Sequence, residues 1–118
     1  MKVLIVEDNR AMLHLLCSIV NDLAEVFECN NGTEAFSLYE KHRPDWVFMD
    51  VRLKDLNGIE ITRQITQKHS NARILIVTNY DDERLRKSAR TAGACGYVLK
   101  EDVLTLREII SVEIIPDS

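Results

Sequence analysis

Hydrophobic and polar positions along this chain form blocks with two different periods. Short runs of consecutive apolar residues predict strands that are covered on both faces, as in a parallel sheet. Between these runs, apolar residues recur every three or four positions, which predicts amphipathic helices. The runs that predict strands are residues 3–6, 26–29, 46–49, 74–77 and 96–99.

The predicted helices follow these strands one by one. Their apolar stripes run from residue 12 to 23, 35 to 39, 59 to 65, 85 to 92 and 103 to 110. Asp8 or Asn9 can cap the first helix, Pro44 ends the second, and Gly93 stops the fourth. Such alternation predicts an α/β fold in which right-handed crossovers place helices on both faces of a parallel sheet. In a doubly wound five-stranded sheet of order 2-1-3-4-5, strands one and three are neighbours.

Composition and charge narrow the function classes. The chain has 118 residues, 46% hydrophobic and 29% charged, which suits one ordinary globular domain. A net charge of −4 argues against a dedicated nucleic-acid surface. The first apolar run is broken by Glu7 and Asp8, so we expect neither a signal peptide nor a membrane span, and a cytoplasmic protein. Three separated cysteines are interpreted as small buried hydrophobes in a reducing compartment: Cys17, Cys29 and Cys95.

Reactive side chains follow four of the five predicted strands. Glu7 and Asp8 follow the first, Asp50 the third, Thr78 the fourth and Lys100 the fifth. The carboxyl ends of parallel strands share one edge, where open α/β sheets bind ligands. We therefore expect these groups to converge in one crevice.

This set of groups points to phosphoryl chemistry. Two carboxylates about 5 Å apart repel by roughly 3 kcal/mol at an effective dielectric near 20. Either one holds a proton, or a cation lies among them, and Mg²⁺ favours a few carboxylates shared with phosphate. Lys100 can neutralise a phosphoryl group and the Thr78 hydroxyl can donate to it. Phosphoryl transfer onto a carboxylate, giving an aspartyl-phosphate, fits these parts.

Each residue taken alone has a simpler interpretation. Glu7 and Asp8 could only compensate a helix dipole, and Lys100 could extend its ammonium to solvent at the sheet edge. Thr78 could cap the next segment, and Tyr97 could be a half-buried aromatic. Gly58 is most simply a residue with positive φ before a helix. His14, His42 and His69 lie away from the strand ends and are expected in structural positions.

The chain resembles the receiver domain of bacterial two-component response regulators, a flavodoxin-like (βα)5 fold. The motifs that carry this resemblance are Val-Glu-Asp at 6–8, Met-Asp-Val-Arg at 49–52, Asn-Gly-Ile-Glu at 57–60, Val-Thr at 77–78 and Gly-Ala-Cys-Gly-Tyr-Val-Leu-Lys at 93–100. The match extends to about residue 111. We expect a receiver domain over residues 1–113, with 114–118 as a tail or the start of a linker.

The resemblance implies a role for each position. Asp50 would be the phosphoacceptor, and Thr78 and Lys100 would contact the phosphoryl group. Mg²⁺ (or Mn²⁺) would be held by Asp8, Asp50 and the backbone carbonyl of Arg52, with Glu7 helping indirectly. Tyr97 matches the aromatic that turns inward when the threonine moves to the phosphate. The donor would be a phosphohistidine on a sensor histidine kinase.

Several positions depart from the usual receiver pattern. Lys54 stands where the family has proline, which predicts a less stiff loop, and Asn79 replaces a small residue beside Thr78. Arg52 and Tyr80 are bulky groups beside the expected acyl phosphate, and we hypothesise that they slow its hydrolysis. Glu101 replaces a proline after the lysine, a form that resembles receivers of LuxR/FixJ-type transcription regulators.

The expected output is a change in the face formed by residues 82–92, 96–99 and the last helix. That face would support a homodimer or partner docking, with DNA contacted only through an output domain absent from these 118 residues. Two alternatives stay open: a stand-alone receiver acting by protein contact, and a binding module of the same fold that no longer uses phosphate. An enzyme is disfavoured, because the loop after strand one is acidic where nucleotide and flavin binders cradle phosphate. Aspartyl phosphohydrolases commonly have a second aspartate at the position of Arg52.

Overall fold

The computed structural model describes residues 1–112, and a five-stranded parallel sheet forms its centre. The strands are β1 (Lys2–Val6), β2 (Glu25–Cys29), β3 (Trp46–Met49), β4 (Ile74–Thr78) and β5 (Gly96–Leu99). Their order is β2-β1-β3-β4-β5, and all four neighbouring pairs are parallel. The predicted doubly wound sheet is therefore confirmed. The segment predicted as a tail, 114–118, lies outside the described residues.

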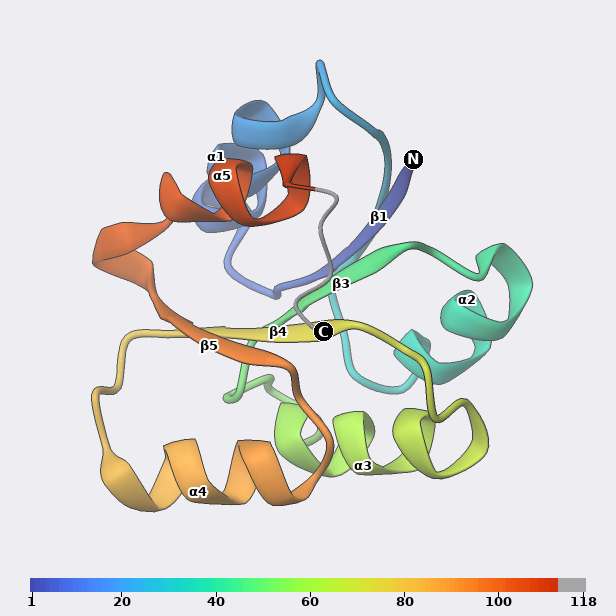
Figure 1. Cartoon of the computed structure of the whole chain (residues 1–118), viewed down its shortest axis with the longest axis vertical. Coiled ribbons are helices and arrows are strands. Elements are labelled where there is room, and N and C mark those ends of the chain that lie inside the picture. Colours follow the sequence, from blue (N-terminus) through green and yellow to red (C-terminus); the bar gives the residue numbers. More distant parts are fainter. Residues whose placement is uncertain (113–118) are drawn as a thin grey trace.

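Helices connect the strands and cover both faces of the sheet. They are α1 (Arg10–Val20), α2 (Ala35–His42), α3 (Gly58–Lys68), α4 (Glu83–Thr91) and α5 (Thr105–Ser111), with a 3-10 turn η1 (Lys100–Asp102) before the last. Figure 1 shows α1 and α5 together on one face and α3 and α4 on the other, with α2. Each face has its own buried cluster, one around Leu16, Phe48 and Leu106 and the other around Met49, Ile61 and Ile76.

Side-chain caps set where three helices begin, in the connections that leave the carboxyl edge of the sheet. Asn9 Oδ1 accepts the Met12 amide at 2.9 Å, Asn57 Oδ1 accepts the Ile59 amide at 2.7 Å, and Asp82 caps α4. Gly93, at φ +102°, follows α4 as predicted. These caps hold the connections that follow β1, β3 and β4, from which the site is built.

The cysteine prediction holds for only one of three residues. Cys29 is buried at the end of β2, whereas Cys17 is half-buried on α1 and Cys95 is exposed. Cys95 lies in the turn before β5, where its backbone amide pairs with the Ile74 carbonyl at 2.9 Å while its side chain stays outside the core. An apolar sequence neighbourhood did not distinguish these three environments. Within residues 1–112, no helix combines the length and apolar character needed to cross a bilayer.

Candidate functional site

Three carboxylates meet where β1 and β3 end side by side. Val6 is in register with Met49, so the residues that follow, Glu7 and Asp50, leave the sheet next to each other. One oxygen from each of Glu7, Asp8 and Asp50 can be chosen so that all three lie within 4.8 Å of one another. Glu7 and Asp50 are buried and Asp8 is half-buried. The predicted convergence of these acids is present in the structure.

Lys100 enters this cluster from the end of β5. Its Nζ lies 2.9 Å from Glu7 Oε1 and 3.5 Å from Asp50 Oδ1. Among residues 1–112, Glu7 Oε1 is nevertheless a buried oxygen without a hydrogen bond, because the ammonium approaches it outside hydrogen-bonding geometry. The ammonium contacts two of the three clustered carboxylates, Glu7 and Asp50, so the ionised cluster carries excess negative charge. A hard cation with oxygen ligands fits this donor set and the unsatisfied oxygen.

Burial changes the acidity of Asp50. The pKa of this carboxyl is raised from 3.8 to about 6, first by desolvation and then by the nearby Glu7 carboxylate, while Lys100 acts in the opposite direction. Ionised Asp50 is thus held at a free-energy cost when no cation is present. A cation that favours the ionised form would relieve this cost.

Thr78, Tyr80 and Tyr97 are linked across the ends of β4 and β5. Thr78 is buried, and its Oγ1 accepts the Tyr80 amide at 3.2 Å. The Tyr97 hydroxyl donates to the Tyr80 carbonyl at 2.6 Å, and the Arg86 guanidinium carbon lies 4.5 Å from the centre of the Tyr97 ring. One residue, Tyr80, therefore connects the threonine and the tyrosine that the sequence singled out separately.

Arg52 and Tyr80 form a pair beside the acid cluster. The Arg52 guanidinium carbon lies 4.3 Å from the centre of the Tyr80 ring, a cation–π geometry. Both residues are exposed, as is Asn79 next to Thr78. The backbone of Arg52 pairs with Asn57 and so closes the loop that follows Asp50.

Gly58 does not have the positive φ that the sequence predicts, and that expectation was wrong. It is the first residue of α3, and its requirement for glycine is one of space. A Cβ there would lie 1.8 Å from the Asp50 carbonyl oxygen and 3.0 Å from Met49 Cγ. The start of α3 therefore packs directly on the backbone of Asp50.

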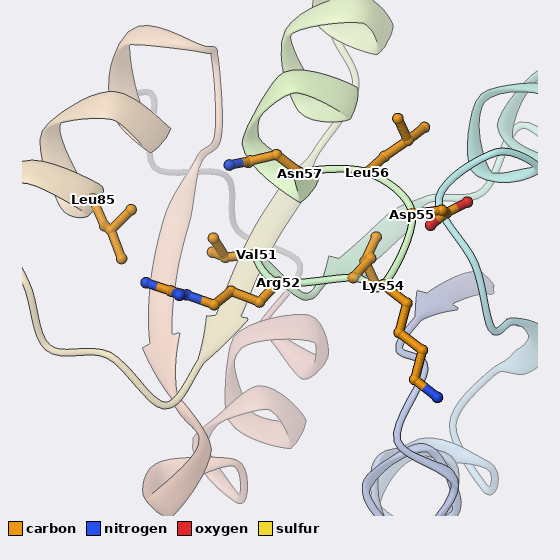
Figure 2. A pocket seen from close by; sticks show the side chains of 8 residues that line it. Val51, Arg52, Lys54, Asp55, Leu56, Asn57 and Leu85 are labelled. Carbon is orange, nitrogen blue, oxygen red and sulfur yellow. The ribbon is translucent and has the colours of Figure 1, made fainter.

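A groove of about 500 Å³ lies between the loop after Asp50 and α4 (Figure 2). Arg52 and Lys54 leave the loop in different directions, with Arg52 on the side of Leu85. The lining residues are Val51, Arg52, Leu53, Lys54, Asp55, Leu56, Asn57 and Leu85. None of the three clustered acids lines this groove, so it is adjacent to the acidic site and distinct from it.

Sequence reasoning missed two contacts of the site. The Glu7–Lys100 ion pair joins a residue predicted to help hold the cation to a residue predicted to contact the phosphoryl group. The Lys54 backbone amide donates to Asp8 Oδ2 at 2.7 Å, although Lys54 drew notice only as a missing proline. The departure from proline was the available signal for the second contact, since only a non-proline residue has this N–H.

Comparison with known proteins agrees with this geometry. A family model described as "Response regulator receiver domain" matches residues 3–111. The chain is 37% identical over 100 residues to the chemotaxis protein CheY of Halobacterium salinarum, covering 84% of this chain and 83% of CheY. It is 30% identical over 115 residues to the transcriptional regulatory protein DegU of Brevibacillus brevis, covering 94% of this chain and 49% of DegU.

A solved structure gives the same result. The two-component response regulator of the LuxR family from Aurantimonas superimposes with a TM-score of 0.86 at 34% identity, covering 93% of this chain and 81% of that one. The chain spans about half the length of DegU, so the activity of such a whole regulator is not carried over. The fold, the motifs and these matches together show that the chain belongs to the response regulator receiver domain family.

Proposed function

We propose that this chain is a Mg²⁺-dependent phosphoacceptor switch in which Asp50 receives a phosphoryl group from a phosphohistidine of a sensor histidine kinase. The supporting observation is the cluster of Glu7, Asp8 and Asp50 with Lys100 at one sheet edge. An Asp50 carboxylate oxygen attacks phosphorus, an O–P bond forms and the donor N–P bond breaks. The electron pair stays on the imidazole nitrogen, which takes a proton from solvent. The product is an aspartyl-phosphate.

The residues around Asp50 have separate tasks. Asp8, Asp50 and the backbone carbonyl of Arg52 would hold Mg²⁺, with Glu7 acting indirectly, and the ion would offset the charge of the phosphoryl oxygens. Lys100 already lies 3.5 Å from Asp50 Oδ1 and supplies a positive charge to the incoming group. The Thr78 hydroxyl supplies a hydrogen-bond donor.

The contacts of Tyr80 connect this chemistry to a change of shape. When the Thr78 hydroxyl turns to the phosphoryl group, its 3.2 Å contact with the Tyr80 amide is lost. The Tyr80 carbonyl also accepts from Tyr97 at 2.6 Å, so displacement of Tyr80 releases Tyr97 to turn inward. The two contacts thus make Thr78 and Tyr97 move together.

Helix α4 is the element best suited to respond. On its inner side it buries only Ala89, with Leu85 half-buried, whereas its end is held by a 2.6 Å hydrogen bond from Thr66 Oγ1 to the Ala92 carbonyl. A helix with so little buried apolar area is weakly anchored at its beginning, where Tyr80 precedes it. The α4–β5–α5 face would then support a homodimer or partner docking.

The wider setting is a cytoplasmic transcription regulator. DegU is named a transcriptional regulatory protein, and contact with DNA would require a separate output domain, since this domain has a net charge of −4. A phosphate-independent binding module is the second candidate, because Asn79 stands exposed beside Thr78 in place of a small residue.

Intact mass after incubation with a small acyl phosphate and Mg²⁺ separates the two candidates. We expect one phosphoryl adduct in the natural chain and none in Asp50→Asn. Asp45→Asn, which changes an exposed acid at the opposite end of β3, is the matched control and should still gain the adduct. An adduct that persists in Asp50→Asn, or no adduct in any chain, would overturn the phosphoacceptor proposal.

A further inference from the structure

The loop after Asp50 is attached to its neighbours through two adjacent residues. The Lys54 amide donates to Asp8 Oδ2 at 2.7 Å. The Asp55 carboxylate accepts the Gly32 amide at 2.8 Å, the Thr33 amide at 2.9 Å and the Thr33 hydroxyl at 2.6 Å. The loop thus contacts both the connection after β1 and the connection after β2. The sequence predicts a less stiff loop because residue 54 is not proline. These hydrogen bonds constrain the loop in another way.

The contact with Asp8 differs from the others because Asp8 belongs to the acid cluster. One Asp8 oxygen accepts the Lys54 N–H, so the rotation of the carboxylate is restricted and its other oxygen is left for a ligand. An outer hydrogen bond of this kind orients a metal-binding carboxylate, and its removal typically weakens metal binding about 10- to 100-fold. A proline at position 54 could not make the contact.

We infer that the backbone amide of Lys54 is a positioning group that orients Asp8 for the divalent cation. This inference rests on the proposed Mg²⁺ site, and it assigns to residue 54 a function of its backbone, not of its side chain. The same hydrogen bond links cation binding at Asp8 to the loop of residues 51–57, which lines the groove next to α4. Cation binding at Asp8 should therefore change the environment of the Lys54 amide.

Lys54→Pro and Lys54→Ala test this role as a pair. Both variants lack the ammonium, and only the alanine variant keeps the N–H, so their difference isolates the amide. We expect calorimetric titration with Mg²⁺ to show about tenfold weaker binding for Lys54→Pro than for Lys54→Ala. Equal affinities, or tighter binding by the proline variant, would overturn the inference while leaving the Mg²⁺ site in place. No Mg²⁺ binding by the natural chain would instead overturn the proposed function and the inference together.

A measurement on the unaltered backbone covers the case in which Lys54→Pro does not fold. In the natural chain without metal, the Lys54 amide should exchange with deuterium more slowly than in Asp8→Ala, which lacks the acceptor. Its NMR resonance should also shift when Mg²⁺ is added, because the acceptor carboxylate gains a cation. Equal exchange rates of the Lys54 amide in the two chains, or a Lys54 amide resonance that does not shift at saturating Mg²⁺, would contradict the positioning role.

Discussion

Replacing Asp50 by asparagine should stabilise the metal-free fold at neutral pH. The raised pKa means that the folded chain holds the Asp50 proton more tightly than the unfolded chain does. This contribution to stability is complete below pH 3.8 and is lost as the pH rises through about 6. The asparagine side chain avoids that loss, because its carbonyl can face Lys100 and its NH₂ can face Glu7.

The size of the effect follows from the pKa. The rise from 3.8 to about 6 spans about two pH units, and each unit corresponds to about 1.4 kcal/mol, so Asp50→Asn should gain about 3 kcal/mol at pH 8. The gain should shrink toward zero as the pH falls to about 4. Mg²⁺ at about 100 times its Kd would stabilise the natural chain by about 2.7 kcal/mol and nearly remove the difference at pH 8.

Urea denaturation with EDTA, followed by the fluorescence of Trp46, measures this difference. Trp46 is the only tryptophan and is buried at the start of β3, so its emission reports unfolding of the sheet. Asp102→Asn changes an exposed aspartate and should stay within about 0.5 kcal/mol of the natural chain. This expectation would be refuted if Asp50→Asn is no more stable than the natural chain at pH 8, or if its gain in stability does not depend on pH. Either result would mean that ionisation of Asp50 does not destabilise the fold.

Three further outcomes are expected. Mg²⁺ affinity should fall about tenfold per pH unit below pH 6, because protonated Asp50 is not a ligand; titration calorimetry at pH 5 and 7 with equal affinities would contradict this. Arg52→Ala and Tyr80→Ala should each shorten the lifetime of the acyl phosphate several-fold, because the attacking water would meet less steric hindrance. Unchanged decay of the phosphorylated mass would contradict this shielding hypothesis. Gly58→Ala should cost roughly 1–3 kcal/mol or more, because its Cβ meets the Asp50 carbonyl; a urea midpoint equal to that of the natural chain would contradict the close packing.

The sheet and the convergence of its reactive residues could be predicted from the sequence. Apolar runs such as 46–49 and 74–77 have the length and content of buried parallel strands, and each is followed by a helical period. Parallel strands place their carboxyl ends at one edge, so Glu7, Asp50 and Lys100 had to approach one another once the strand order was known. Local composition and strand order were therefore sufficient to predict the sheet and the convergence of these side chains.

Local pattern did not predict how the loops approach the site. Gly58 was expected to need positive φ, but its space is limited by the Asp50 carbonyl, an atom eight positions away. Lys54 was expected to weaken its loop, but its amide meets Asp8, which lies 46 positions away. Cys95 was expected inside and lies outside. In each case the contact or the exposure depends on how loops pack against one another. Loops have no hydrophobic period from which this packing could be predicted.

The amino-acid sequence by itself determined which charged and hydroxyl side chains follow the strands and on which edge of the sheet they stand, because the hydrophobic period of each segment is a local property. The tertiary structure alone decided which oxygen faces which partner: Glu7 faces Lys100, Asp8 accepts an amide from the loop after β3, and Tyr80 joins Thr78 to Tyr97. Hydrogen bonds and ion pairs act over a few ångströms, so they are fixed only when the loops have packed.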